Sequence, residues 1–270
     1  MSKKIYKKKA SQIRKELLEK FYLLKEGHPG SVFSILDVLI VLYYGKFVRI
    51  KGKKVIDDVI MSKGHATVGQ YPILKDLNVI TKNDWVNWGV KKSVLKMFGN
   101  NSIPGIKTAT GSLGHGIGFG TGMAFFSKFV SKIKKESYVI ISEGELYEGS
   151  TWEALLLLSH LKIGNVTIIL DVNNNIILGD TKKCLNLGDI KKKLVSFGIK
   201  TLECDAHDFS QLEKNFFKLK KINKPKCLIV NSVKGKGFKI MENKANWHYW
   251  NPISKNVLEK SIKDLEKYYE

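Results

Sequence analysis

The chain has 270 residues, 43% of them hydrophobic, which is enough for one large α/β domain with a substantial core. Its formal net charge is +21, but only Arg14 and Arg49 are arginines among the 46 basic residues, and the lysines are spread along the whole chain. Because base readout and bidentate phosphate binding favour arginine, we interpret the charge as a lysine-rich composition, with or without an acidic partner. We expect no nucleic-acid partner, and a basic polyanion-binding protein is the less favoured alternative.

Targeting signals and cysteine chemistry are also restricted by the sequence. No stretch resembles a transmembrane span, and the first twelve residues, MSKKIYKKKASQ, lack the apolar core of a signal peptide. Cys184, Cys204 and Cys227 are odd in number and widely spaced, with no metal-ligand pairing. We therefore expect a reduced, cytoplasmic protein with no membrane partner.

Apolar periodicity and turn residues predict alternating helices and strands. Helices are predicted over residues 10–25, 35–44, 65–77, 82–88, 113–134, 149–162, 187–197, 208–219 and 257–269. Strands are predicted over residues 55–61, 138–141, 166–170, 201–204 and 226–233. This alternation predicts an α/β domain with a central, mostly parallel sheet flanked by helices on both faces. Ser31 is expected to cap the second helix, and the last helix is a candidate for packing on a partner.

Residues 140–175, IISEGELYEGSTWEALLLLSHLKIGNVTIILDVNNN, form the most informative unit of the chain. They predict a strand, an acidic turn, a leucine-rich helix and a second strand, and a right-handed crossover would bring the two strand ends together. Oxygens of Glu143, Asn173 and the Asn175 carbonyl would suit Mg²⁺ or Ca²⁺, and the amides around Gly144 would suit a phosphate. The unit therefore predicts a metal–diphosphate site, against the alternative of an ordinary βαβ unit with solvated turns.

The same stretch resembles the thiamine-diphosphate motif of transketolases. That motif runs GDG-E, then EGS-WEA, and places an asparagine 30 residues after the GDG aspartate, as Asn173 follows Glu143 here. One departure is that GDG has become Ser142-Glu143-Gly144, so the carboxylate reaches one methylene further. The resemblance implies thiamine diphosphate and Mg²⁺ (or Ca²⁺) as cofactors, with a metal ligand set of Glu143, Asn173 and Asn175.

Further motifs follow in the family's order: GHPG at 27–30, SKGHA at 62–66, TGSLGHG at 110–116 and KGKG…MEN…WH at 234–248. By resemblance, the residues implied in catalysis are His28, His65, His248 and Glu148, the last by coupling two active sites across an interface. By the same resemblance, the residues implied in cofactor binding are His65, Gly111, Ser112, Leu113, Glu143, Gly144, Asn173 and His248. Their combination is more specific than any single motif.

Three positions depart from the family's usual pattern. Asn100 stands where most transketolases have a substrate-binding histidine, His115 replaces a glutamine, and Tyr249 replaces a glycine. These changes suggest an acceptor other than the usual sugar phosphates, such as a larger or nucleotide-linked sugar. His207 and His160 are interpreted as structural or helix-surface residues.

The resemblance covers residues 10–250 but only the N-terminal domain of transketolase. We therefore expect residues 1–270 to form a single diphosphate-binding domain, with the pyrimidine-binding and C-terminal domains on a separate chain. This is the pattern of the N-terminal subunit of a split transketolase, active in two-carbon ketol transfer from a ketose donor to an aldose acceptor. The implied partner is a transketolase C-terminal-type subunit, and the implied assembly is a heterotetramer with two copies of each chain. A non-catalytic or divergent paralogue subunit is the alternative.

Overall fold

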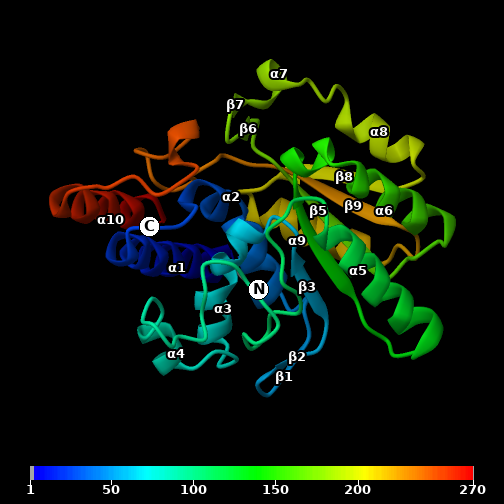
Figure 1. Ribbon diagram of the computed structural model, residues 1–270, viewed down its shortest axis with the longest axis horizontal. Helices are drawn as coiled ribbons and strands as arrows, with labels where there is room; N and C mark the ends of the chain where they lie inside the picture. The colour runs from blue at the N-terminus through cyan, green and yellow to red at the C-terminus, as the bar shows by residue number, and fades with distance from the viewer. Residues whose placement is uncertain (1–2, 270) are drawn as a thin grey trace.

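A computed structural model describes residues 3–269 and contains a central sheet of five parallel strands (Figure 1). The strands, in the spatial order β3-β4-β5-β9-β8, are β3 (Asp58–Met61), β4 (Ser137–Ser142), β5 (Val166–Val172), β9 (Lys226–Asn231) and β8 (Lys200–Asp205). Strands β4, β5 and β9 are apolar in near-continuous runs because both faces of a parallel sheet are covered, whereas the edge strand β8 alternates between buried and exposed residues. The predicted α/β class and parallel sheet are confirmed.

Helices cover both faces of this sheet, as predicted. One face is covered by α1 (Lys3–Leu24), α2 (Pro29–Tyr44), α9 (Phe209–Lys220) and α10 (Lys255–Tyr269). The other face is covered by α5 (Gly116–Phe125), α6 (Gly149–His160) and α8 (Ile190–Ser196). All residues of α2 are buried, which explains why its sequence is apolar on every side. No helix in the part of the chain that the structure describes is long and apolar enough to cross a membrane.

Short elements complete the described chain. They are the hairpin β1 (Ile50–Lys51) with β2 (Lys54–Val55), α3 (Tyr71–Asp76), α4 (Lys82–Val86), the hairpin β6 (Asn175–Ile176) with β7 (Gly179–Asp180), and α7 (Thr181–Cys184). Short segments of 3₁₀ or π helix are η1 (Gly64–Gln70), η2 (Phe126–Val130), η3 (Glu143–Tyr147) and η4 (Ala245–Trp247). The two hairpins and α7 were not predicted because each is too short to show a periodic pattern.

Several predicted boundaries were wrong for identifiable reasons. The second helix begins at Pro29 rather than at residue 35, and Ser31 is not its cap, because proline occupies the first helical position after His28. The helix predicted over 65–77 is a 3₁₀ segment followed by α3, and the one predicted over 113–134 ends in the π turn η2. The strand predicted over 55–61 is interrupted between β2 and β3.

The C-terminal helix packs on this chain itself. Helix α10 lies along α1, and its Leu265 and Tyr269 are buried there. The Tyr269 ring lies 5.5 Å from the Arg14 guanidinium. The expectation that this helix packs on a partner is therefore wrong for its apolar side, which packs on α1 of the same chain.

A buried ion pair joins α1 to α2 beneath these helices. The guanidinium of Arg14, itself fully buried, donates to both carboxylate oxygens of Asp37 over 2.6 and 2.9 Å. Although burial opposes ionisation, Arg14 and then His207 hold the pKa of the Asp37 carboxyl below its ordinary value. Removing either charge would leave the other buried and uncompensated, because water does not reach the site to solvate it.

We predict that Asp37→Ala lowers the free energy of unfolding by about 3–5 kcal/mol, because it leaves a buried guanidinium without a counter-charge. Urea unfolding followed by circular dichroism measures this loss. Lys15→Ala is the control: it removes the exposed Lys15–Glu266 pair of the neighbouring surface and should change stability by less than about 1 kcal/mol. Equal losses in the two variants would contradict the prediction.

Candidate functional site

A cavity of about 260 Å³ lies at the carboxyl edge of the sheet, where β3, β4 and β5 end. The predicted site residues in its lining are His65, Leu113, Glu143, Gly144, Glu148, Asn173, Asn175 and His248. The remaining predicted residues lie at its border: the His28 ring is next to those of His65 and His248, while Gly111 and Ser112 are exposed just before Leu113. Residues from five distant motifs thus meet in one place.

The floor of the cavity is a buried ion pair that sequence reasoning missed. Lys63, which follows β3, makes a short ion pair with Asp171 near the end of β5, and both side chains are essentially inaccessible to water. Asp171 also accepts hydrogen bonds from Ser34 of α2 and from Ser232 after β9. Lys63 donates in turn to the Ser31 carbonyl over 2.9 Å. Although burial opposes ionisation, Lys63 holds the pKa of the Asp171 carboxyl below its ordinary value.

Glu145 holds together the turns that form the wall. Its buried carboxylate accepts hydrogen bonds from the Ser62 hydroxyl, from the Gly114 amide at 3.0 Å and from the Ser142 amide at 2.9 Å. These donors belong to the SKGHA, TGSLGHG and SEGE segments, so one side chain fixes the relative positions of three motifs. Gly64 is required here, because a Cβ atom would overlap the Thr110 carbonyl.

The longer side chain of Glu143 reaches the backbone of the neighbouring strand end. Its Oε1 atom accepts from the amides of Asn173 at 3.2 Å and Asn175 at 3.0 Å. Burial, with the charge of Asp171 added, raises the pKa of the Glu143 carboxyl to about 7. The right-handed crossover predicted from residues 140–175 therefore does bring the two strand ends together.

Three histidines line one side of the site. The ring centroids of His28, His65 and His248 lie 5.1–5.5 Å apart, and the buried Nδ1 of His28 has no hydrogen-bond partner among the described residues. Burial, and next the charge of Lys234, lowers the pKa of His28 and of His248 to about 4. Burial, and next Lys63, lowers the pKa of His65 well below its ordinary value. All three rings are therefore neutral at neutral pH.

Lys234 is a second lysine that sequence reasoning did not single out. It is almost fully buried, and its ammonium group lies 3.5 Å from the carbonyl oxygens of Asn175 and Ile176 and 3.4 Å from Nδ1 of His248. Burial, and next the charge of Lys63, lowers its pKa to about 8. This residue is the first of the KGKG motif. Its position just after the apolar strand β9 was the sequence signal that could have identified it.

The donor set fits a metal–diphosphate better than a metal alone. No group of three or more His, Cys, Asp or Glu side chains within residues 3–269 could hold a metal ion. Glu143 offers its second carboxylate oxygen, and the Asn173 side chain and Asn175 carbonyl offer neutral oxygens, next to two lysines that favour an anion. Mg²⁺ commonly binds in this way, through few protein ligands and the phosphates of a second molecule. The buried Nδ1 of His28 has no hydrogen-bond partner among the described residues, and a bound molecule would supply one.

The three departures from the usual pattern lie in different places. Asn100 is engaged in its own turn, where its side-chain oxygen accepts from the Ser102 amide at 2.9 Å. His115 is exposed at the start of α5. The Tyr249 ring lies 4.9 Å from the ring of His28 and is about half exposed at the mouth of the site. Of the three, Tyr249 is therefore the one in ring contact with a site histidine.

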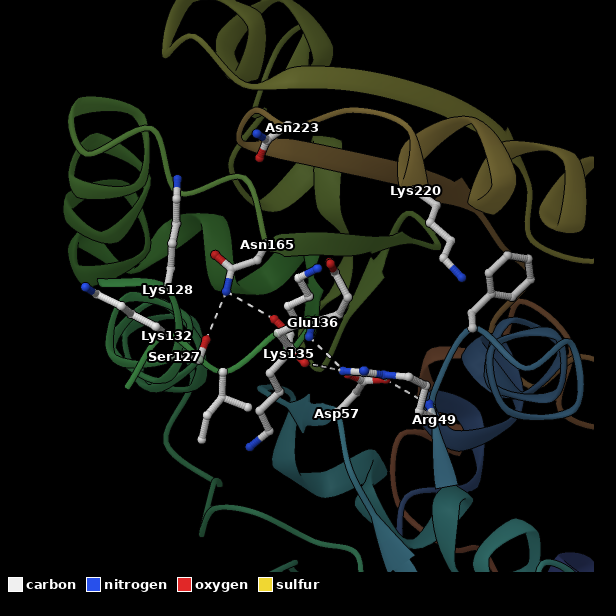
Figure 2. A pocket seen from close by; sticks show the side chains of 13 residues that line it. Arg49, Asp57, Ser127, Lys128, Lys132, Lys135, Glu136, Asn165, Lys220 and Asn223 are labelled. Atoms are coloured by element: carbon white, nitrogen blue, oxygen red, sulfur yellow. Dashed lines mark hydrogen bonds and ion pairs between the residues drawn. The ribbon is translucent and has the colours of Figure 1, made fainter. Parts of the chain in front are cut away.

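A larger cavity of about 490 Å³ lies at the opposite, amino edge of the sheet (Figure 2). Its basic residues are Arg49, Lys128, Lys132, Lys134, Lys135 and Lys220. Arg49 is paired with Asp57 at 2.6 Å, Lys135 with Asp58 at 2.7 Å, and the carboxyl of Glu136 also borders the cavity. Two of its six basic residues are paired in this way, so the cavity keeps an excess of positive charge.

Comparison with known proteins agrees with the geometry of the carboxyl edge. The family described as "Transketolase, thiamine diphosphate binding domain" matches residues 5–262. The chain belongs to the transketolase family. It contains the domain of this family of transferases that binds thiamine diphosphate, and the predicted resemblance is confirmed.

Individual relatives are of two lengths. The chain is 32% identical over 259 residues to an apulose-4-phosphate transketolase subunit from Phocaeicola vulgatus, covering 94% of this chain and 91% of that protein. It is also 32% identical to the protein of the same name from Actinobacillus succinogenes, covering 88% of it. The solved transketolase of Campylobacter jejuni superposes with a TM-score of 0.89 and 26% identity, over 98% of this chain but 43% of that one. The transketolase-family chain thus spans less than half of a full-length transketolase.

We predict that proton binding at His28 and His248 lowers the stability of this protein as the pH falls from about 6.5 toward 4, and that the raised pKa of Glu143 opposes this loss over part of the same range. Over this window the unfolded chain binds protons at His28 and His248 that the folded chain excludes, so the free energy of unfolding decreases with falling pH. Urea unfolding at several pH values measures the slope, and NMR titration of the imidazoles measures the pKa values.

His28→Asn should reduce this slope, whereas His160→Asn, at an exposed position of α6, should not. Titration of His28 and His248 near 6.5 in the folded chain would show that the histidines are not desolvated as described.

Proposed function

We propose that this chain is the diphosphate-binding subunit of a two-subunit transketolase that transfers a two-carbon ketol unit from a ketose to an aldose. The observation that carries the proposal is that Glu143, Asn173, His65 and His248 line one cavity of a transketolase-family domain, with the Lys234 ammonium group 3.4 Å from Nδ1 of His248. The name shared by the two bacterial relatives of similar length points to a sugar phosphate as the substrate class.

Each part of the site has a role toward the cofactor. Glu143, Asn173 and the Asn175 carbonyl would hold the metal, while His65, Lys234 and the amide of Gly144 would hold the diphosphate. Gly111, Ser112 and Leu113 form the surface for the rings. When bound, thiamine diphosphate supplies a carbanion-stabilising centre for breaking and making the carbon–carbon bond.

The histidines act on the substrate. His28 and His248 are neutral at neutral pH, so each can accept a proton from a sugar hydroxyl and return it without first losing one. The free Nδ1 of His28 is the atom available for this contact. Tyr249 beside His28 borders the path by which a sugar would approach.

A second polypeptide completes the site in this proposal. Large apolar side chains are exposed along α5, η2 and α6, which lie side by side (Figure 1): Phe119, Phe125, Phe126, Phe129, Val130, Leu156 and Leu157. Such a surface is typical of a protein–protein interface. It starts at the TGSLGHG segment, and Glu148 is exposed beside it. We propose that a second copy of this chain and a transketolase C-terminal-type subunit cover it in a heterotetramer.

Glu143→Ala is expected to weaken thiamine diphosphate binding about ten- to a hundred-fold in the presence of Mg²⁺, because it removes the only carboxylate of the proposed metal set. Glu143→Asp should bind at least as well as the natural chain, since it restores the usual residue of the motif. Isothermal titration of the chain with its partner subunit, with and without Mg²⁺, measures both.

Glu259→Ala, on the exposed side of α10, is the control and should leave binding unchanged. Normal, metal-dependent binding by Glu143→Ala would show that another residue holds the metal.

We further predict that the isolated chain has no ketol-transfer activity and that Phe126→Asp prevents its assembly with the partner. The substitution places a charge in the middle of the apolar surface, where docking would remove it from water. Sedimentation velocity of the mixed subunits measures assembly. Val86→Asp, which places the same charge on the exposed helix α4, is the matched control. Activity of the isolated chain, or normal assembly of Phe126→Asp, would contradict this arrangement.

A further inference from the structure

The segment that places Lys234 against Asn175, Ile176 and His248 of the cavity lining is held in position by a histidine. The amide of Val233, which precedes Lys234, donates to Nε2 of His207 over 2.9 Å. The other ring nitrogen of His207, Nδ1, lies 2.8 Å from Oδ2 of the buried Asp37. Because Nε2 accepts, Nδ1 must carry the proton, so Asp37 fixes the tautomer that the Val233 contact requires.

Two further hydrogen bonds hold the same segment. Nε of Arg14 donates to the Lys236 carbonyl over 3.0 Å, and the Gly235 amide donates to the Gly30 carbonyl over 2.9 Å. Arg14 is itself held by Asp37. The Arg14–Asp37–His207 network therefore holds the backbone on both sides of Lys234.

We propose that His207 is a positioning residue for Lys234, which it places for diphosphate binding through the Val233 amide. Lys234 has four rotatable side-chain bonds, so its ammonium group is placed only if its backbone is fixed. The ammonium group lies within 3.5 Å of the carbonyl oxygens of Asn175 and Ile176, so a shift of the loop would alter both contacts. This inference rests on the proposed function in one respect, namely that Lys234 contacts the diphosphate.

Two substitutions separate the two hydrogen bonds of His207. Asparagine places its amide where Nδ1 lies, so His207→Asn keeps a donor to Asp37 but leaves the Val233 amide without an acceptor. Glutamine reaches the position of Nε2, so His207→Gln keeps an acceptor for Val233 but loses the contact with Asp37. A role limited to stability would make the two variants differ only in how much they destabilise the chain.

The experiment measures thiamine diphosphate binding with Mg²⁺ by isothermal titration, and thermal unfolding, for the chain together with its partner subunit. We expect His207→Asn to raise the Kd for the cofactor about tenfold, because a displaced Lys234 would lose one hydrogen bond to the diphosphate, and to unfold at a lower temperature as well, because the Val233 amide loses its acceptor. His207→Gln should bind within about twofold of the natural chain but unfold at a lower temperature. His160→Asn is the matched control and should change neither property.

Lys234→Met distinguishes the possible failures. If Lys234→Met binds the cofactor weakly but His207→Asn binds it normally, the positioning role is wrong and the proposed function stands. If Lys234→Met binds normally, Lys234 does not contact the diphosphate, and both this inference and that part of the proposed site are overturned. A loss of binding in His207→Asn that only parallels its loss of thermal stability would also overturn the inference.

Discussion

The ion pair between Lys63 and Asp171 is the constraint on which the rest of the site depends. Neither charge is reached by water, so each is stable only in the presence of the other. Asp171 also takes hydrogen bonds from Ser34 and Ser232, and Lys63 donates to the Ser31 carbonyl. These contacts bind α2 and the ends of β3, β5 and β9 to one point. The cavity above them therefore has a fixed floor.

This floor also determines the electrostatics of the cavity. Lys63 and Lys234 bring two buried positive charges to the site, where the carboxyl of Glu143 and several backbone oxygens also lie. Burial, and next the charges of these lysines, lowers the pKa values of the nearby histidines, so that these are neutral at neutral pH. A metal–diphosphate carries both signs of charge and can satisfy both kinds of group at once, which a lone metal or a lone phosphate would not.

The sequence contained the local part of this arrangement and not the long-range part. The strands, the crossover unit and the motif residues were predictable because each depends on neighbours in the chain. Lys63 and Asp171 are 108 residues apart, and nothing in either segment indicates that they meet. Asn100 was interpreted through the substrate position of its family motif, but it lies in a turn closed by its own side chain. The predicted helix over 113–134 was too long because its apolar pattern continues through a π turn that periodicity does not distinguish from an α-helix.

The two ends of the proposed cofactor site differ in how much of them this chain builds. At the proposed diphosphate end Lys63, Glu143 and Asn173 are buried, whereas at the proposed ring end Gly111 and Ser112 are exposed. A ligand bound by one end alone keeps much of its surface in water, so most of the affinity for its rings has to come from another surface. If a partner subunit supplies that surface, thermodynamic reciprocity requires the cofactor to strengthen assembly of the two chains by the same factor by which the partner strengthens cofactor binding. Assembly and cofactor binding are then coupled equilibria. The exposed apolar surface lies beside the ring end, so a partner bound to it could also contact the rings of the cofactor.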